Sequence, residues 1–101
     1  MIELNQLAKD LGNYRRKNCL PQGNYEYSFL RAIGETIEAY EAHKRGDDIN
    51  LGEELADTII FVLDVADKKN IDIEQALLKK FEKIKRRHYV KRNGYVVKEE
   101  P

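Results

Sequence analysis

The sequence predicts an all-α protein, a compact four-helix bundle that oligomerises through its helices and ends in a short C-terminal β-hairpin. Two observations predict this fold class. Apolar residues recur at helical spacing in four successive segments, and residues typical of turns (Gly, Pro, Asn and Asp) separate these segments. With 101 residues, the chain has the length of one small domain, which we expect to span residues 1–101.

The first two expected helices span residues 2–17 and about 25–44, and Pro21 and Gly23 predict a loop between them. Each helix carries one apolar stripe at the spacing of an amphipathic helix. The stripes consist of Leu4, Leu7, Ala8 and Leu11 in the first helix, and of Leu30, Ile33, Ile37 and Tyr40 in the second. The first helix ends in the cations Arg-Arg-Lys at 15–17. They either reach a phosphate or form a solvated helix end that the helix dipole favours.

The third expected helix spans about residues 50–69, and its apolar residues cover most of its circumference. Such a helix is buried on several sides. A bundle of 101 residues can hardly bury one helix so completely by itself. We therefore expect a homodimer or homotetramer in which part of this surface meets another subunit.

The fourth expected helix begins after Asp72, which can cap it together with Gln75, and it ends in a strongly basic run. Its core stripe consists of Ile73, Leu77, Phe81 and Ile84. Further on, Asn93-Gly94 between short apolar-rich runs predicts a β-hairpin. An isolated two-stranded hairpin is marginally stable in water, so this one must pack on the bundle or stay mobile.

Composition and charge narrow the class of protein. No stretch approaches the roughly 18 apolar residues of a membrane span, the N-terminus lacks the features of a signal peptide, and Cys19 has no intrachain partner. We therefore expect a cytoplasmic protein without membrane contact. The formal net charge is zero, which argues against nucleic-acid binding. Acids predominate at 35–67 and bases at 79–92. Either an acidic centre holds metal while a basic arm meets phosphate, or the two segments attract each other across the bundle.

Four carboxylates predict a metal site. Glu35 and Glu38 lie three apart on the second helix, and Glu54 and Asp57 lie three apart on the third, so each pair shares one side of its helix. Four ionised carboxylates cannot gather unpaired, because like charges repel and desolvation disfavours them. A hard divalent cation with oxygen ligands removes that cost, so we expect Mg²⁺, with Mn²⁺ as an alternative.

Two neighbouring acids complicate the choice of ligands. Glu41 could replace or supplement a ligand on the second helix, and Glu53 forms an i, i+4 pair with Asp57.

Signatures of other enzyme classes are missing from the sequence, since it has no Gly-rich phosphate loop, no G-x-S-x-G motif and no paired cysteines.

The same carboxylate motifs carry a resemblance to a known family. They read Glu35-x-x-Glu38 and, after a turn, Glu53-Glu54-Leu55-Ala56-Asp57 followed by an apolar run. Together they resemble the MazG-like, all-α NTP pyrophosphohydrolase superfamily. The segment 67–76 and the basic run to Arg87 resemble the last two helices of that family. The resemblance covers about residues 25–88 and leaves 89–101 as a tail.

The resemblance implies a role for each of several residues. The implied magnesium ligands are Glu35, Glu38, Glu54 and Asp57, and the implied substrate-binding residues are Phe61, Lys80, Lys83 and Arg87. As catalytic residue we select Glu38, which could orient the attacking water. The chain differs from many members at Gly34, where they carry another glutamate, and at Ile84, where they carry asparagine.

The resemblance implies an Mg²⁺-dependent enzyme that hydrolyses a nucleoside triphosphate to a nucleoside monophosphate and pyrophosphate. Two alternatives stay open. One is a related pyrophosphohydrolase acting on dUTP or phosphoribosyl-ATP. The other is a non-catalytic helical interaction module with the same fold.

Overall fold

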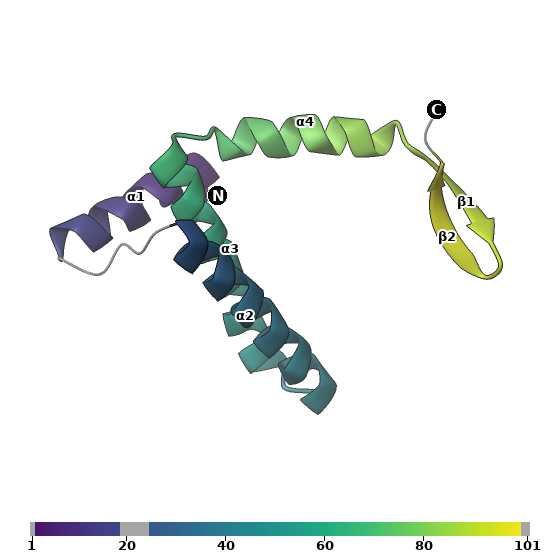
Figure 1. The fold of residues 1–101 in the computed structure, drawn as a ribbon, viewed down its shortest axis with the longest axis horizontal. Helices are drawn as coiled ribbons and strands as arrows, with labels where there is room; N and C mark the ends of the chain where they lie inside the picture. Colours follow the sequence, from purple (N-terminus) through teal and green to yellow (C-terminus); the bar gives the residue numbers. More distant parts are fainter. Residues whose placement is uncertain (1, 19–24, 100–101) are drawn as a thin grey trace.

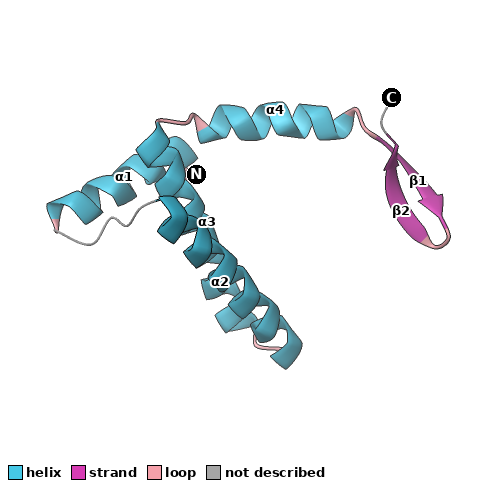
Figure 2. Ribbon diagram, in the orientation of Figure 1, coloured by secondary structure: helices cyan, strands magenta, loops and turns pink. Residues whose placement is uncertain are grey.

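The computed structural model describes residues 2–18 and 25–99 and is dominated by helices (Figures 1 and 2). The elements are α1 (Leu4–Lys17), α2 (Tyr25–Arg45), α3 (Asp48–Lys69), α4 (Ile73–Lys85), β1 (His88–Arg92) and β2 (Tyr95–Glu99). The predicted all-α class, with four helices and a C-terminal hairpin, is confirmed. The loop predicted around Pro21 and Gly23, together with Cys19, lies outside the described residues.

Side-chain caps and a left-handed residue determine where the later helices begin and end. The Asp47 side chain accepts a hydrogen bond from the backbone N–H of Asn50 (3.1 Å), so α3 begins two residues earlier than predicted. Asp72 accepts one from the N–H of Gln75 (3.0 Å) and caps α4 as expected. Asn70 ends α3 in the left-handed region (φ 54°), a conformation that asparagine tolerates better than most residues.

The helices α2 and α3 form an antiparallel hairpin with the most extensive contact between any two elements of the described residues (Figure 1). Gly46, with φ of 71°, lies in the tight turn between them, where the absence of a Cβ removes the steric cost of positive φ. Small or aliphatic side chains are buried along the two helices: Ala39, Ala42, Leu63 and Ala66. The hairpin therefore places the middle of α2 beside the first half of α3.

A buried ionic cluster ties α1 to this hairpin. Asp64 of α3 is 4% exposed, and it accepts hydrogen bonds from Ser28 of α2 (2.5 Å) and Lys68 of α3 (2.8 Å) and pairs with Arg15 of α1. Arg16 pairs with Asp67 in the same region (3.4 Å). The sequence leaves open whether Arg15 and Arg16 meet phosphate or solvent, and the structure gives both a third role as partners of α3 carboxylates.

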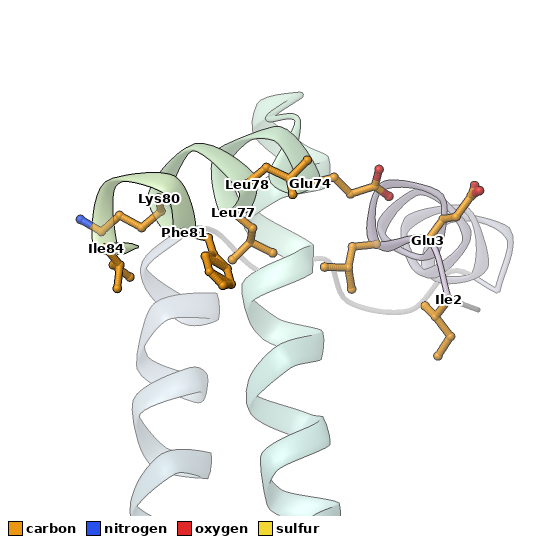
Figure 3. Close-up of a pocket in the computed structure, with 9 residues that line it drawn as sticks. Ile2, Glu3, Glu74, Leu77, Leu78, Lys80, Phe81 and Ile84 are labelled. Atoms are coloured by element: carbon orange, nitrogen blue, oxygen red, sulfur yellow. The ribbon is translucent and has the colours of Figure 1, made fainter. Parts of the chain in front are cut away.

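The fourth helix leads away from the α2–α3 hairpin (Figure 1). Its main contact within the chain is the start of α1, where the Asn5 side chain accepts a hydrogen bond from the N–H of Ile73 (3.0 Å) and donates one to Asp72 (2.8 Å). The apolar face of α4 borders a groove of about 700 Å³ that Ile2 also lines (Figure 3). One chain thus leaves much of this face exposed.

The hairpin of β1 and β2 lies beyond the far end of α4 (Figure 2). Asn93 and Gly94 both have positive φ (51° and 81°) at its turn, as the Asn-Gly signal predicts. In this chain the hairpin does not lie beside α2 or α3 (Figure 1). Across the described residues, no helix combines the length and the apolar character that crossing a membrane requires.

Candidate metal centre

Three of the four predicted metal ligands meet on the α2–α3 hairpin. Glu35 and Glu38 lie almost one turn apart on α2, and Glu54 faces them from α3 because the two helices are antiparallel. Each of these residues offers a carboxylate oxygen, and the three oxygens lie within 4.8 Å of one another. Within the described residues, this is a group of acidic side chains that could hold a metal ion.

The three carboxylates differ in their exposure to solvent. Glu35 is 5% exposed, Glu54 is half-buried, and Glu38 is exposed. The Oε2 atom of Glu54 is buried and has no hydrogen-bond partner in the described part of the chain. An ionised Glu54 would leave this buried acceptor without a donor, which is costly, so either a proton on the carboxyl group or a bound cation has to compensate. The group thus has a closed side at Glu35 and an open side at Glu38.

Neighbouring acids raise the pKa of Glu54 from its ordinary 4.5 to about 8. The main cause is the hydrogen bond that a protonated Glu54 shares with Glu35, followed by the one shared with Glu38, and then by burial and the charges of the same two residues. At neutral pH the carboxyl group of Glu54 is therefore mostly protonated in the metal-free protein. A set of carboxylate oxygens fits a hard cation such as Mg²⁺ or Mn²⁺.

We expect Mg²⁺ binding at pH 7 to release about one proton per ion, because a carboxylate must be deprotonated to ligate a metal. Calorimetry at pH 7 should therefore give binding heats that depend on the ionisation enthalpy of the buffer. At pH 9, above the Glu54 pKa of about 8, this dependence should disappear. Buffer-independent heats at pH 7 would show that Glu54 does not hold the displaced proton.

The same pKa predicts how pH changes the stability of the metal-free protein. The folded state keeps its Glu54 proton up to a pKa of about 8, whereas the unfolded chain loses it near 4.5. The folded state thus binds more protons between these values, so its stability falls as pH rises through this window.

The other acidic candidates lie outside the group. Asp57 is half-buried on α3, three residues beyond Glu54, but its carboxylate does not join the three clustered oxygens. Its role as a fourth ligand stays a prediction. Glu41 and Glu53, the two complicating acids, are exposed and also stand apart from the group.

An aromatic and cationic cluster adjoins the carboxylates at Phe61. The rings of Phe61 and Tyr27 meet edge to face, with centroids 6.4 Å apart. The Arg31 guanidinium lies over the Phe61 ring, 5.4 Å from its centroid, and donates a hydrogen bond to Glu35 (2.7 Å). Sequence reasoning missed Tyr27 and Arg31. Their signal is the i, i+4 spacing of Tyr27, Arg31 and Glu35 along one side of α2.

The predicted phosphate-binding cations are not brought to the carboxylates within one chain. Lys80 and Lys83 belong to α4, which leads away from the α2–α3 hairpin, and Arg87 follows it (Figure 1). Lys80 borders the apolar groove (Figure 3). The Nε atom of Arg87 is buried and lacks a hydrogen-bond partner among the described residues. Contact of these three residues with phosphate stays a prediction.

Comparison with protein families shows what the chain is similar to. A family model described as the MazG nucleotide pyrophosphohydrolase domain matches residues 24–90. Comparisons with curated proteins and with solved structures give no match. The matched residues include α2, α3 and α4, and so they contain the three clustered glutamates.

Proposed function

Since the chain belongs to the MazG nucleotide pyrophosphohydrolase family, we propose that it hydrolyses a nucleoside triphosphate to a nucleoside monophosphate and pyrophosphate in an Mg²⁺-dependent reaction. Besides the family match, one observation on this chain supports the metal-dependent reaction: carboxylate oxygens of Glu35, Glu38 and Glu54 lie within 4.8 Å of one another. In the metal-free protein a proton on Glu54 and the ion pair between Arg31 and Glu35 reduce the repulsion of these carboxylates, whereas one divalent cation would bind oxygens of all three.

In the proposed reaction each residue has a role that its position supports. Glu35, Glu38 and Glu54 hold the ion, with Asp57 as a fourth ligand. When bound, Mg²⁺ polarises phosphoryl oxygens and lowers the pKa of a bound water. Glu38, on the solvent side of the group, orients the attacking water. The water oxygen forms a bond to the α phosphorus and becomes part of the nucleoside monophosphate, the proton that it loses passes to solvent, and pyrophosphate leaves with the oxygen that bridged the α and β phosphates.

We propose that the aromatic pair next to the carboxylates receives the nucleoside. Phe61 and Tyr27 lie in edge-to-face contact, and Tyr27 is about half exposed. Aromatic faces bind a base by stacking, which is tolerant of base identity. This position supports the predicted place of Phe61 near the nucleotide.

Exposed apolar faces on α2 and α4 support a homodimer or homotetramer. On α2, Leu30 and Ile33 are 67% and 57% exposed, and on α4 Phe81 is 56% exposed. Apolar faces of this extent mark contact with another surface. A second copy would also explain the direction of α4. This helix leads away from the carboxylates of its own chain, so that Lys80, Lys83 and the following Arg87 could reach the carboxylates of a partner subunit.

We expect sedimentation at micromolar concentration to give a species larger than the 11.8 kDa chain. Ile33→Asp places a charge on the exposed α2 face and should shift the protein towards monomer, because burying an unpaired charge in an interface is costly. Lys9→Asp, at an exposed position of α1, is the control and should keep the wild-type mass. A monomeric wild-type protein would contradict the shared interface.

A nucleotide panel tests the function directly. Pyrophosphate release should be measured with the common ribo- and deoxyribonucleoside triphosphates, dUTP and phosphoribosyl-ATP, each with and without Mg²⁺. Metal-dependent release from several triphosphates supports the proposal. Release from dUTP or phosphoribosyl-ATP alone assigns the narrower alternative, and a folded protein that releases no pyrophosphate from any of them is a non-catalytic interaction module.

A further inference from the structure

Arg31 occupies a position between the carboxylate group and the aromatic pair. Its guanidinium donates a hydrogen bond to Oε1 of Glu35 at 2.7 Å and lies 5.4 Å from the centroid of the Phe61 ring. The Glu35 side chain is 6% exposed, whereas that of Arg31 is 48% exposed. The arginine is thus anchored to a buried acid but open to solvent on its other side.

A metal ion and Arg31 would compete for the same carboxylate. A cation bound at Glu35 would neutralise the negative charge that attracts the guanidinium in the metal-free protein. It would also repel Arg31, because both are positively charged. Because the Arg31 side chain is half exposed, it has room to turn away from Glu35. The face of the Phe61 ring still attracts the guanidinium and keeps it close to the carboxylate group.

A guanidinium released from Glu35 beside the metal could bind the phosphates of the substrate. A triphosphate carries more negative charge than one divalent ion neutralises, and the planar fork of an arginine binds phosphate oxygens in a bidentate manner. The basic residues of α4 lead away from the carboxylates in this chain (Figure 1). Arg31, by contrast, already touches a carboxylate of the group.

We propose that Arg31 is a substrate-binding residue that pairs with Glu35 in the metal-free protein and binds the polyphosphate chain once metal occupies the carboxylates. This inference rests on the proposed function, because it takes the metal and the polyphosphate from it. It adds a cation from α2 to a site whose other expected cations lie on α4 or just after it.

The test uses inorganic tripolyphosphate as the probe and calorimetry as the measurement. In the presence of saturating Mn²⁺, Arg31→Gln should weaken tripolyphosphate binding at least about tenfold, the effect of losing a charge-assisted contact. Arg31→Lys should recover part of this loss, since it keeps the charge but not the fork. Arg45→Gln removes an exposed arginine from the end of the same helix and should change little.

Mn²⁺ binding without phosphate separates this role from a structural one. Arg31→Gln should bind Mn²⁺ as tightly as the wild type or more tightly, because the competitor for Glu35 is gone. Weaker Mn²⁺ binding would show that Arg31 only positions Glu35, and unchanged tripolyphosphate binding would show that it is only an ion-pair partner. Either result overturns the inference.

The outcome also stays distinct from that of the proposed function. If tripolyphosphate binding depends on Arg31 but no nucleotide yields pyrophosphate, the proposed hydrolase function is wrong and the role of Arg31 in phosphate binding stands. If the protein hydrolyses nucleotides but the Arg31→Gln variant keeps the wild-type KM and tripolyphosphate affinity, the hydrolase function stands and the proposed role of Arg31 is wrong.

Discussion

Glu54→Gln is expected to remove Mg²⁺ binding at the carboxylate group and, with it, metal-dependent pyrophosphate release. Glu54 supplies one of the three clustered carboxylates and the only one from α3. Removing a residue that merely supports a metal ligand costs about 10–100-fold in metal affinity or activity. Loss of a ligand should therefore lower kcat/KM by at least about 100-fold.

The fold should survive this substitution. A glutamine amide has the shape of a protonated carboxyl group, which is the form that the pKa of about 8 favours for Glu54 at pH 7. It can also donate to Glu35 and Glu38. The unfolding temperature of the metal-free variant should therefore equal or exceed that of the wild type, and Mg²⁺ should no longer raise it, because a ligand stabilises only the state that binds it.

Glu53→Gln is the matched control for this experiment. It makes the same chemical change one residue earlier on α3, at an exposed carboxylate outside the group. Metal binding and activity should stay near wild type. If Glu53→Gln caused the loss and Glu54→Gln did not, the metal would lie elsewhere on the hairpin, and the site as described would be wrong.

Asp64→Asn is expected to lower the free energy of unfolding by about 3–5 kcal/mol, the usual cost of breaking a buried ion pair by removing one partner. Asp64 is 4% exposed and holds Arg15, Lys68 and Ser28 together. Its replacement removes the buried carboxylate that pairs with Arg15 and Lys68 where α1 meets the hairpin. For a small domain this is a large share of a stability of about 5–15 kcal/mol.

Urea denaturation measures this effect, and pH adds a second check. Burial alone would raise the pKa of Asp64, but hydrogen bonds from Lys68 and Ser28 and the charges of Arg15 and Lys68 outweigh it, so the pKa lies below its ordinary 3.8. The stabilising contribution is therefore complete above that value and is lost as pH falls through the folded pKa.

Asp10→Asn, at an exposed position of α1, is the control and should change stability by no more than about 0.5 kcal/mol. A loss as small as this in Asp64→Asn would show that the buried cluster does not hold α1 in place.

Features that depend on local sequence could be predicted. The capping of α4 by Asp72 and the turn at Asn93-Gly94 involve residues within a few positions of one another, so their chemistry is visible in the sequence. The meeting of Glu35, Glu38 and Glu54 needed two further assumptions, that a short turn makes the two helices antiparallel and that α2 turns Glu35 towards α3. The second assumption opposes the apolar stripe predicted for α2, which is exposed in this chain: Leu30, Ile33, Ile37 and Tyr40.

Features that depend on packing between distant segments could not be predicted. In the sequence, Asp64 is one more acid on the acidic side of a largely apolar helix, and its burial depends on α1 crossing α3 at Arg15. The contact of Arg31 with Phe61 joins two helices whose rotation about their axes the apolar pattern does not specify. The direction of α4 likewise depends on contacts with Asn5, far away in the sequence.

Anomalous diffraction from crystals grown with Mn²⁺ is the most direct test of the metal site. We expect a manganese peak at ligand distance, about 2.0–2.3 Å by analogy with other hard cations, from oxygens of Glu35, Glu38 and Glu54. The Arg31 guanidinium should then have left Glu35. Manganese bound elsewhere on the chain, with no ion at these three carboxylates and Arg31 still paired to Glu35, would show that the metal site is wrong.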